Sequence, residues 1–72
     1  MKNVLVFKTS VTGKNEVQQL KPLLNRLVNQ HGYWNFDLED CDNILRVETQ
    51  SLSAPAISSL LQKSGFHCEE LH

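Results

Sequence analysis

The chain has 72 residues, enough for one small domain, because domains usually contain ~100–150 residues and only much longer chains divide into several. We therefore expect residues 1–72 to form a single domain, and a composition of 40% hydrophobic and 21% charged residues excludes a fibrous or low-complexity protein. Seven Lys and Arg against eight Asp and Glu give a net charge of −1, without the basic surplus that neutralises phosphates, so a nucleic acid is not an expected partner.

The small size also bears on function. A domain of this length buries only ~60% of its unfolded surface, which leaves little interior for a deep substrate cavity, so we expect a binding domain and not an enzyme. No apolar run approaches the ~20 residues that cross a bilayer, and the first apolar run is too short for a signal peptide. We therefore expect a cytoplasmic protein with no membrane partner, in which Cys41 and Cys68 are reduced thiols.

The first half of the chain predicts a strand, a helix and a second strand. Residues 4–7 are β-branched or aromatic or leucine, which indicates a buried strand. From Asn15, the expected helix cap, apolar residues recur at three- and four-residue spacing up to an expected stop at Gly32. Pro22 lies inside this stripe without changing its phase, so one kinked helix is expected instead of two. Residues 33–39 then alternate apolar and polar side chains, as in a half-buried strand.

The second half predicts a strand, a helix and a final strand. A short turn at 40–43 forces the alternating residues 45–50 to pair antiparallel with the preceding strand. Ser53 is expected to cap a helix that Gly65 ends. Residues 66–71 are too few for a helix and predict the last strand.

The resulting order of strand, helix, strand, strand, helix, strand is that of the ferredoxin-like α/β sandwich, an α+β fold. In it, two interleaved strand–helix–strand halves form a four-stranded antiparallel sheet with both helices on one face. This topology brings three connections to one end of the sheet, and we expect a site built from several loops there. The connections are residues 9–14, 40–43 and 65–67.

The first of these connections contains residues 11–17, Val-Thr-Gly-Lys-Asn-Glu-Val. In this segment and in the apolar pattern of the following helix, the chain resembles the heavy-metal-associated domain of copper chaperones and metal-transporting ATPases. The signature of that family is Met-Thr-Cys-x-x-Cys-Val. Residues 63–69, Lys-Ser-Gly-Phe-His-Cys-Glu, are similar to the family's Ala-Gly-Tyr ending before the last strand. The positions that correspond to these motifs are Val11, Thr12, Gly13, Glu16 and Phe66.

Gly13 and Glu16 stand where the resemblance implies the two cysteines. In the family, two thiolates bind a soft monovalent metal because thiolates are themselves soft and polarisable. Glycine has no ligand atom, and a lone carboxylate is a hard donor that suits Mg or Ca and not Cu(I). The resemblance therefore implies a degenerate domain without the family's ligands and without a cofactor. Its expected role is that of a protein-interaction or sensing module with a protein partner.

A transition-metal binding or delivery protein is the alternative. Cys41, His67 and Cys68 lie in or beside the connections expected to cluster, and two thiolates with an imidazole suit Cu or Zn. Against a shared ion, adjacent side chains on a strand point to opposite faces, and His67 and Cys68 are adjacent. The start of the first helix, with its free amide groups, is a second candidate site, for an anion.

The strand at 33–39 also predicts how two copies would associate. It is expected at an edge of the sheet, where its free backbone groups offer a surface to another chain. Its alternation sends Trp34, Phe36 and Leu38 toward the helices and leaves Tyr33 and polar side chains on the open face. Pairing would run through the backbone and not through an apolar patch, so we expect a weak homodimer at most.

Overall fold

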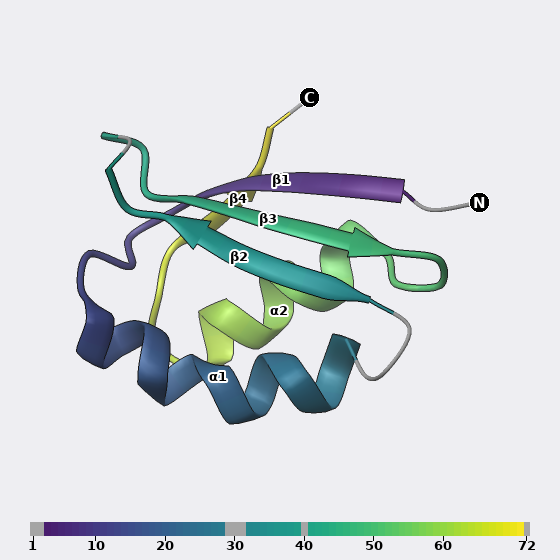
Figure 1. Cartoon of the computed structure of the whole chain (residues 1–72), viewed down its shortest axis with the longest axis horizontal. Helices are drawn as coiled ribbons and strands as arrows, with labels where there is room; N and C mark the ends of the chain where they lie inside the picture. The colour runs from purple at the N-terminus through teal and green to yellow at the C-terminus, as the bar shows by residue number, and fades with distance from the viewer. Residues whose placement is uncertain (1–2, 29–31, 40, 72) are drawn as a thin grey trace.

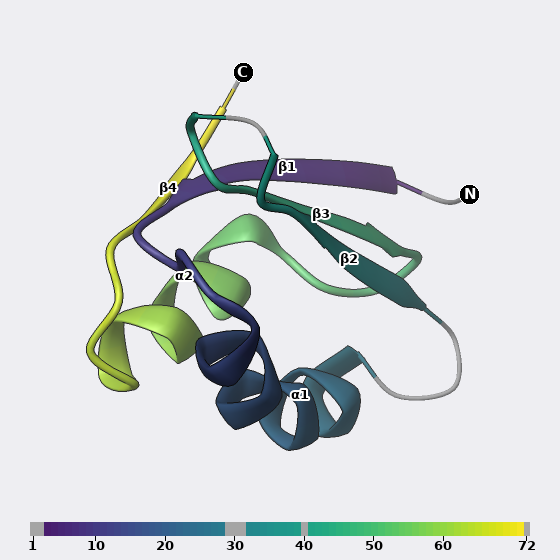
Figure 2. The same ribbon diagram turned by 60° about the vertical axis from the view of Figure 1, so that its left-hand side comes forward.

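The computed structural model describes residues 3–28, 32–39 and 41–71, and within them it contains the expected elements in the expected order (Figure 1). These are β1 (Asn3–Thr9), α1 (Lys14–Val28), β2 (Tyr33–Asp37), β3 (Ile44–Thr49), α2 (Ala54–Lys63) and β4 (Cys68–Glu70). The strands form one antiparallel sheet in the order β2-β3-β1-β4, and both helices lie on the same side of it (Figure 2). The ferredoxin-like sandwich predicted from the sequence is confirmed.

β1 lies in the interior of the sheet and joins the two halves of the fold. It pairs with β3 on one side, where Phe7 is opposite Leu45, and with β4 on the other, where Thr9 is opposite Cys68. Because side chains alternate along a strand, Phe7 is fully buried toward the helices and Lys8 is exposed on the open face. β1 is longer than the predicted 4–7, since it pairs with β3 from Asn3 to Lys8 and with β4 as far as Thr9.

A hydrophobic core fills the space between the sheet and the helices. α1 contributes Leu20 and Leu24 to it, α2 contributes Ile57 and Leu61, and all of these side chains are fully buried. Burial of an aliphatic side chain of this size stabilises the fold by roughly 1.5–3 kcal/mol relative to exposure. The apolar side chains whose three- and four-residue spacing predicts each helix are therefore also the ones that pack it against the sheet.

α1 begins two residues earlier than a cap at Asn15 predicts. The Val17 N–H donates to the Gly13 carbonyl at 3.1 Å and closes the first turn, so Lys14 is the first helical residue. The prediction of Asn15 as the cap is therefore wrong, and Asn15 is inside the helix. Glycine is well tolerated at the position before a helix, which allows the earlier start.

The middle of α1 agrees with the expected single helix. It continues through the exposed Pro22 as one element, as the unbroken apolar stripe predicts. The predicted stop at Gly32 follows residues 29–31, which lie outside the described residues. Gly32 itself directly precedes β2.

α2 has the predicted ends. Ser53 precedes it in an extended conformation, with φ −93° and ψ 157°, although its side chain makes no capping hydrogen bond. Gly65 follows the helix with φ +92°, a left-handed conformation that disfavours other residues, and the Phe66 N–H then donates to the Leu61 carbonyl at 2.9 Å. This bond holds Phe66 against the helix end, so β4 is shorter than the predicted 66–71.

β2 is also shorter than the predicted strand 33–39. It ends at Asp37, where the Asp37 carboxylate accepts the Glu39 N–H at 3.2 Å and turns the chain away from the sheet. The predicted antiparallel pairing with β3 is confirmed, with Asp37 opposite Ile44. Asn43, just before β3, has φ 50°, a left-handed conformation that asparagine tolerates.

Candidate functional site

Three connections meet at one end of the sheet, as the topology predicts. The Thr9 N–H donates to the Asp42 carbonyl at 3.3 Å, and the Thr9 hydroxyl donates to the Asn43 carbonyl at 2.7 Å. On the other side, the Ser10 N–H donates to the His67 carbonyl at 3.1 Å, and the His67 N–H donates to the Ser10 hydroxyl at 2.8 Å. The first loop is thus held from both sides by backbone groups and by the hydroxyls of Thr9 and Ser10.

Within this first loop, a carboxylate occupies the start of α1. Glu16 Oε1 accepts both the Thr12 N–H at 2.7 Å and the Thr12 hydroxyl at 3.0 Å. These two hydrogen bonds from Thr12, which stabilise the ionised form, lower the pKa of the Glu16 carboxyl. Val11 beside them is fully buried and anchors the loop in the core.

The loop therefore does not fit the metal of the family that the sequence resembles. Gly13 has no side chain, and the Glu16 carboxylate already accepts the Thr12 donors. A carboxylate oxygen is in any case a poor partner for a soft ion. The same contact weakens the anion alternative, because the protein's own negative charge already lies at the positive end of the helix.

The candidate ligands of the alternative transition-metal site, Cys41, His67 and Cys68, do not converge. Cys41 is exposed in the β2–β3 connection, whereas Cys68 is buried beneath the helices, and burial raises the pKa of its thiol. The His67 side chain is exposed, with Nε2 3.8 Å from Oε2 of Glu69. Among residues 3–28, 32–39 and 41–71, no three His, Cys, Asp or Glu side chains are close enough to hold a metal ion.

Phe66, the remaining motif position, has a structural role. Its side chain is half-buried against the core, and its N–H is engaged at the end of α2. It therefore supports the connection to β4 without contributing a ligand or a reactive group.

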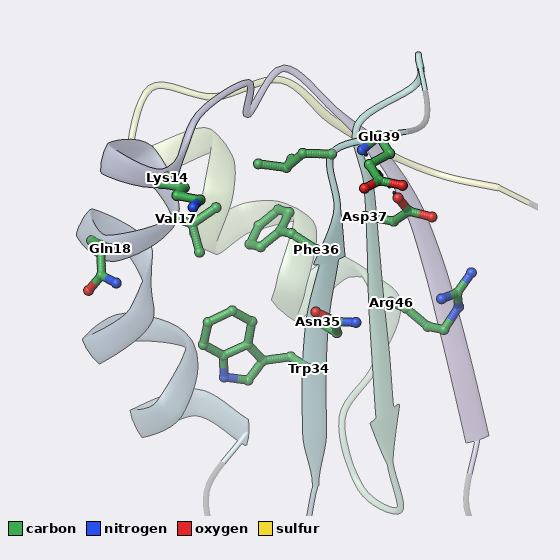
Figure 3. Close-up of a pocket in the computed structure, with 10 residues that line it drawn as sticks. Lys14, Val17, Gln18, Trp34, Asn35, Phe36, Asp37, Glu39 and Arg46 are labelled. Atoms are coloured by element: carbon green, nitrogen blue, oxygen red, sulfur yellow. Dashed lines mark hydrogen bonds between the residues drawn. The ribbon is translucent and has the colours of Figure 1, made fainter.

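A groove of about 580 Å³ lies between α1 and β2, and sequence reasoning did not identify it (Figure 3). Its apolar wall consists of half-buried side chains from α1, from β2 and from the residue that follows β2: Val17, Trp34, Phe36 and Leu38. Its rim is polar and carries both signs of charge, from Lys14, Gln18, Asn35, Asp37, Glu39 and Arg46. The predicted orientation of Trp34, Phe36 and Leu38 toward the helices is confirmed, since all pack against the core.

The two aromatic side chains of the groove are held in fixed positions. Trp34 Nε1–H donates to Oδ1 of Asn25 on α1 at 2.8 Å, which ties the edge strand to the helix. The rings of Trp34 and Phe36 pack edge to face, with centroids 5.9 Å apart and an interplanar angle of 77°. The groove therefore has a preformed apolar wall, as binding sites usually have.

β2 lies at one edge of the sheet, as predicted, and the register identifies its free backbone groups. The Leu71 N–H donates to the Val6 carbonyl at 2.8 Å, so the backbone groups of Val6 point toward β4. Successive residues of an antiparallel strand direct these groups to opposite sides. Val6 and Asn35 are opposite the same residue of β3, whose backbone groups point away from β1 and toward β2. The groups of Asn35 therefore point toward β3. Those of Trp34 and Phe36 therefore point outward from the sheet.

Fold and site together define a ferredoxin-like α/β domain with a filled first loop and an open groove beside an edge strand. No protein-family model matches the chain, and neither a curated protein nor a solved structure matches it. None of the described helices has the length and apolar character needed to cross a membrane.

Proposed function

We propose that this chain is a degenerate heavy-metal-associated-like domain that acts as a protein-interaction module through the groove between α1 and β2. The observation that carries the proposal is the contact of Glu16 with Thr12, because it fills the loop in which the family binds metal. The loop then has no free donor set, whereas the groove next to it has an apolar wall, a charged rim and an adjacent strand edge.

The groove suits an extended segment of a protein better than a small molecule. Outward backbone groups of Trp34 and Phe36 can pair with an added strand, and the apolar wall lies on the side to which alternate side chains of that strand would point. A small polar ligand would leave the outward backbone groups without hydrogen-bond partners and the apolar wall exposed to water. Lys14 on one side of the groove and Asp37 on the other give the rim charges of both signs, with which an added segment can pair.

Selection from a displayed library of extended peptides tests the interaction. We expect selected peptides to lose about tenfold or more in affinity for Gln18→Trp, because the indole fills the groove from an exposed position of α1. Gln19→Trp, at the neighbouring exposed position that does not line the groove, is the matched control and should bind normally. Failure to select any binder, or equal binding to both variants, would contradict the proposal.

The relation to the metal-binding family has a separate test. Gly13→Cys with Glu16→Cys should create a Cu(I) site, because a Cβ at Gly13 meets no atom within 4 Å, and the helix start favours a thiolate. Cu(I) titration under reducing conditions should show binding that the parent and the Gly13→Ser with Glu16→Ser control lack. All proteins carry Cys41→Ser, so that the exposed thiol does not contribute. A folded cysteine variant that binds no better than the serine control would limit the relation to a shared topology.

A further inference from the structure

We infer that a second copy of this chain pairs with the open edge of β2, in one register centred on Asn35. This inference rests on the proposed function, since it names an occupant for the same edge. β2 consists of Tyr33–Asp37, so Asn35 is its middle residue, and a two-fold axis at Asn35 overlaps the two strands along their whole length.

The backbone groups match in this register. Antiparallel pairing about Asn35 places Trp34 of one copy opposite Phe36 of the other, and these are the residues whose N–H and C=O groups point outward. Each N–H therefore meets a carbonyl on both sides of the axis. A shift of the register by one residue would place Asn35, whose groups point inward, opposite a residue of the second copy whose groups point outward. The hydrogen bonds between the two strands would then be lost.

The side chains match as well. On the helix side, Trp34 of each copy becomes the direct neighbour of Phe36 in the second copy, which extends the aromatic wall across the axis. On the open face, the Tyr33 hydroxyl lies beside the Asp37 carboxylate of the second copy, to which it can donate a hydrogen bond. Asn35 faces Asn35, and its amide can both donate and accept. No like charges are directly opposed along the strand.

The small contact area makes this association weak. An edge of five residues is about 17 Å long, and a strip of that length and about 10 Å wide is far smaller than the ~800 Å² that each partner buries in a stable dimer. We therefore expect a dissociation constant on the order of 0.1–1 mM, with the monomer dominant in dilute solution.

Charge complementation at the axis tests the register. Asn35 is exposed, so Asn35→Lys and Asn35→Glu leave the monomer folded but place two like charges opposite each other in the dimer. Sedimentation at about 2 mM should show dimer for the parent, monomer for each variant alone, and dimer again for their equimolar mixture. Val4→Lys and Val4→Glu, on the same face but on the interior strand β1, should dimerise like the parent alone and mixed.

A parent that stays monomeric at this concentration, or variants whose mixture does not restore the dimer, would overturn the inference. If the parent is monomeric and yet binds selected peptides in a Gln18-dependent manner, the second copy is excluded and the proposed function stands. If the parent dimerises in the expected register and no peptide is selected, the inference stands and the edge serves self-association alone.

Discussion

Glu16 stabilises the start of α1 only while its carboxyl group is ionised. Its pKa in the folded protein is lowered from the ordinary value of 4.5 by the hydrogen bonds from Thr12, so the native state favours the charged form. The stabilisation is fully present above pH 4.5 and is lost as the pH falls through the lower folded pKa. Glu16→Gln should therefore lower the melting temperature at neutral pH, and the difference should disappear in acid. Glu39→Gln, in the exposed loop after β2, is the control for loss of one surface charge.

Position 32 requires glycine because a backbone carbonyl and a side chain of neighbouring elements lie very close to it. A Cβ at this position would lie 2.8 Å from the Glu48 carbonyl oxygen and would overlap Cγ1 of Val28. Both belong to packed elements, so we expect Gly32→Ala to lower the free energy of unfolding by roughly 1–3 kcal/mol, measured by denaturant titration. Gly13→Ser, whose Cβ meets nothing within 4 Å, should change it by less than about 0.5 kcal/mol. Equal stabilities for the two variants would contradict this account.

At the scale of an element, the direction in which the backbone groups of β2 point can be measured by amide exchange. Asn35 should have a slowly exchanging amide because its N–H pairs with β3, whereas the amides of Trp34 and Phe36 should exchange fast in dilute solution. Hydrogen exchange followed by NMR separates the three residues. Slow exchange at Trp34 and Phe36 with fast exchange at Asn35 would mean that the register is shifted by one residue. At high concentration, the two outward amides should become protected as dimer forms.

The secondary structure was predictable from the sequence because each element has a periodic apolar face that the core then buries. Leu20 and Leu24 repeat at helical spacing, and Trp34 and Phe36 alternate as in a strand. The ends were less predictable, since they depend on single hydrogen bonds. Asp37 ends β2 by accepting a neighbouring N–H, and no periodicity contains that information.

The candidate site was predictable only in part. The clustering of the three connections follows from topology alone, and the structure has it. The contact between Glu16 and Thr12 has a sequence signal, namely a carboxylate in the first turn of the helix that follows a threonine. The resemblance gave Glu16 the place of a cysteine ligand, so its role at the helix start was not predicted. The groove could not be foreseen, because its volume depends on the distance between α1 and β2 and not on any local pattern.

For the whole molecule, we expect stability that does not depend on metal. Cys41, His67 and Cys68 do not form a ligand group, and Cys68 is packed in the core. Thermal unfolding of the reduced protein should therefore be the same with and without a strong chelator, since a bound metal stabilises the native state only when it binds. Elemental analysis should find no stoichiometric metal. A chelator-induced fall in melting temperature that Cys41→Ser abolishes would instead support a transition-metal site that includes Cys41.

The interior position of β1 also has a consequence for synthesis on the ribosome. Of the four strands of the sheet, β1 is made first, yet its partners are β3 and, last of the four, β4, beside which Ser10 and His67 are hydrogen-bonded. At ~5–20 residues per second, the nascent β1 waits roughly 3–12 s for its final partner. Its apolar residues, Val4 to Phe7, gain their first sheet partner when β3 has been made, roughly 2–8 s after β1. The order of translation thus leaves one side of β1 unpaired until β4 has been made.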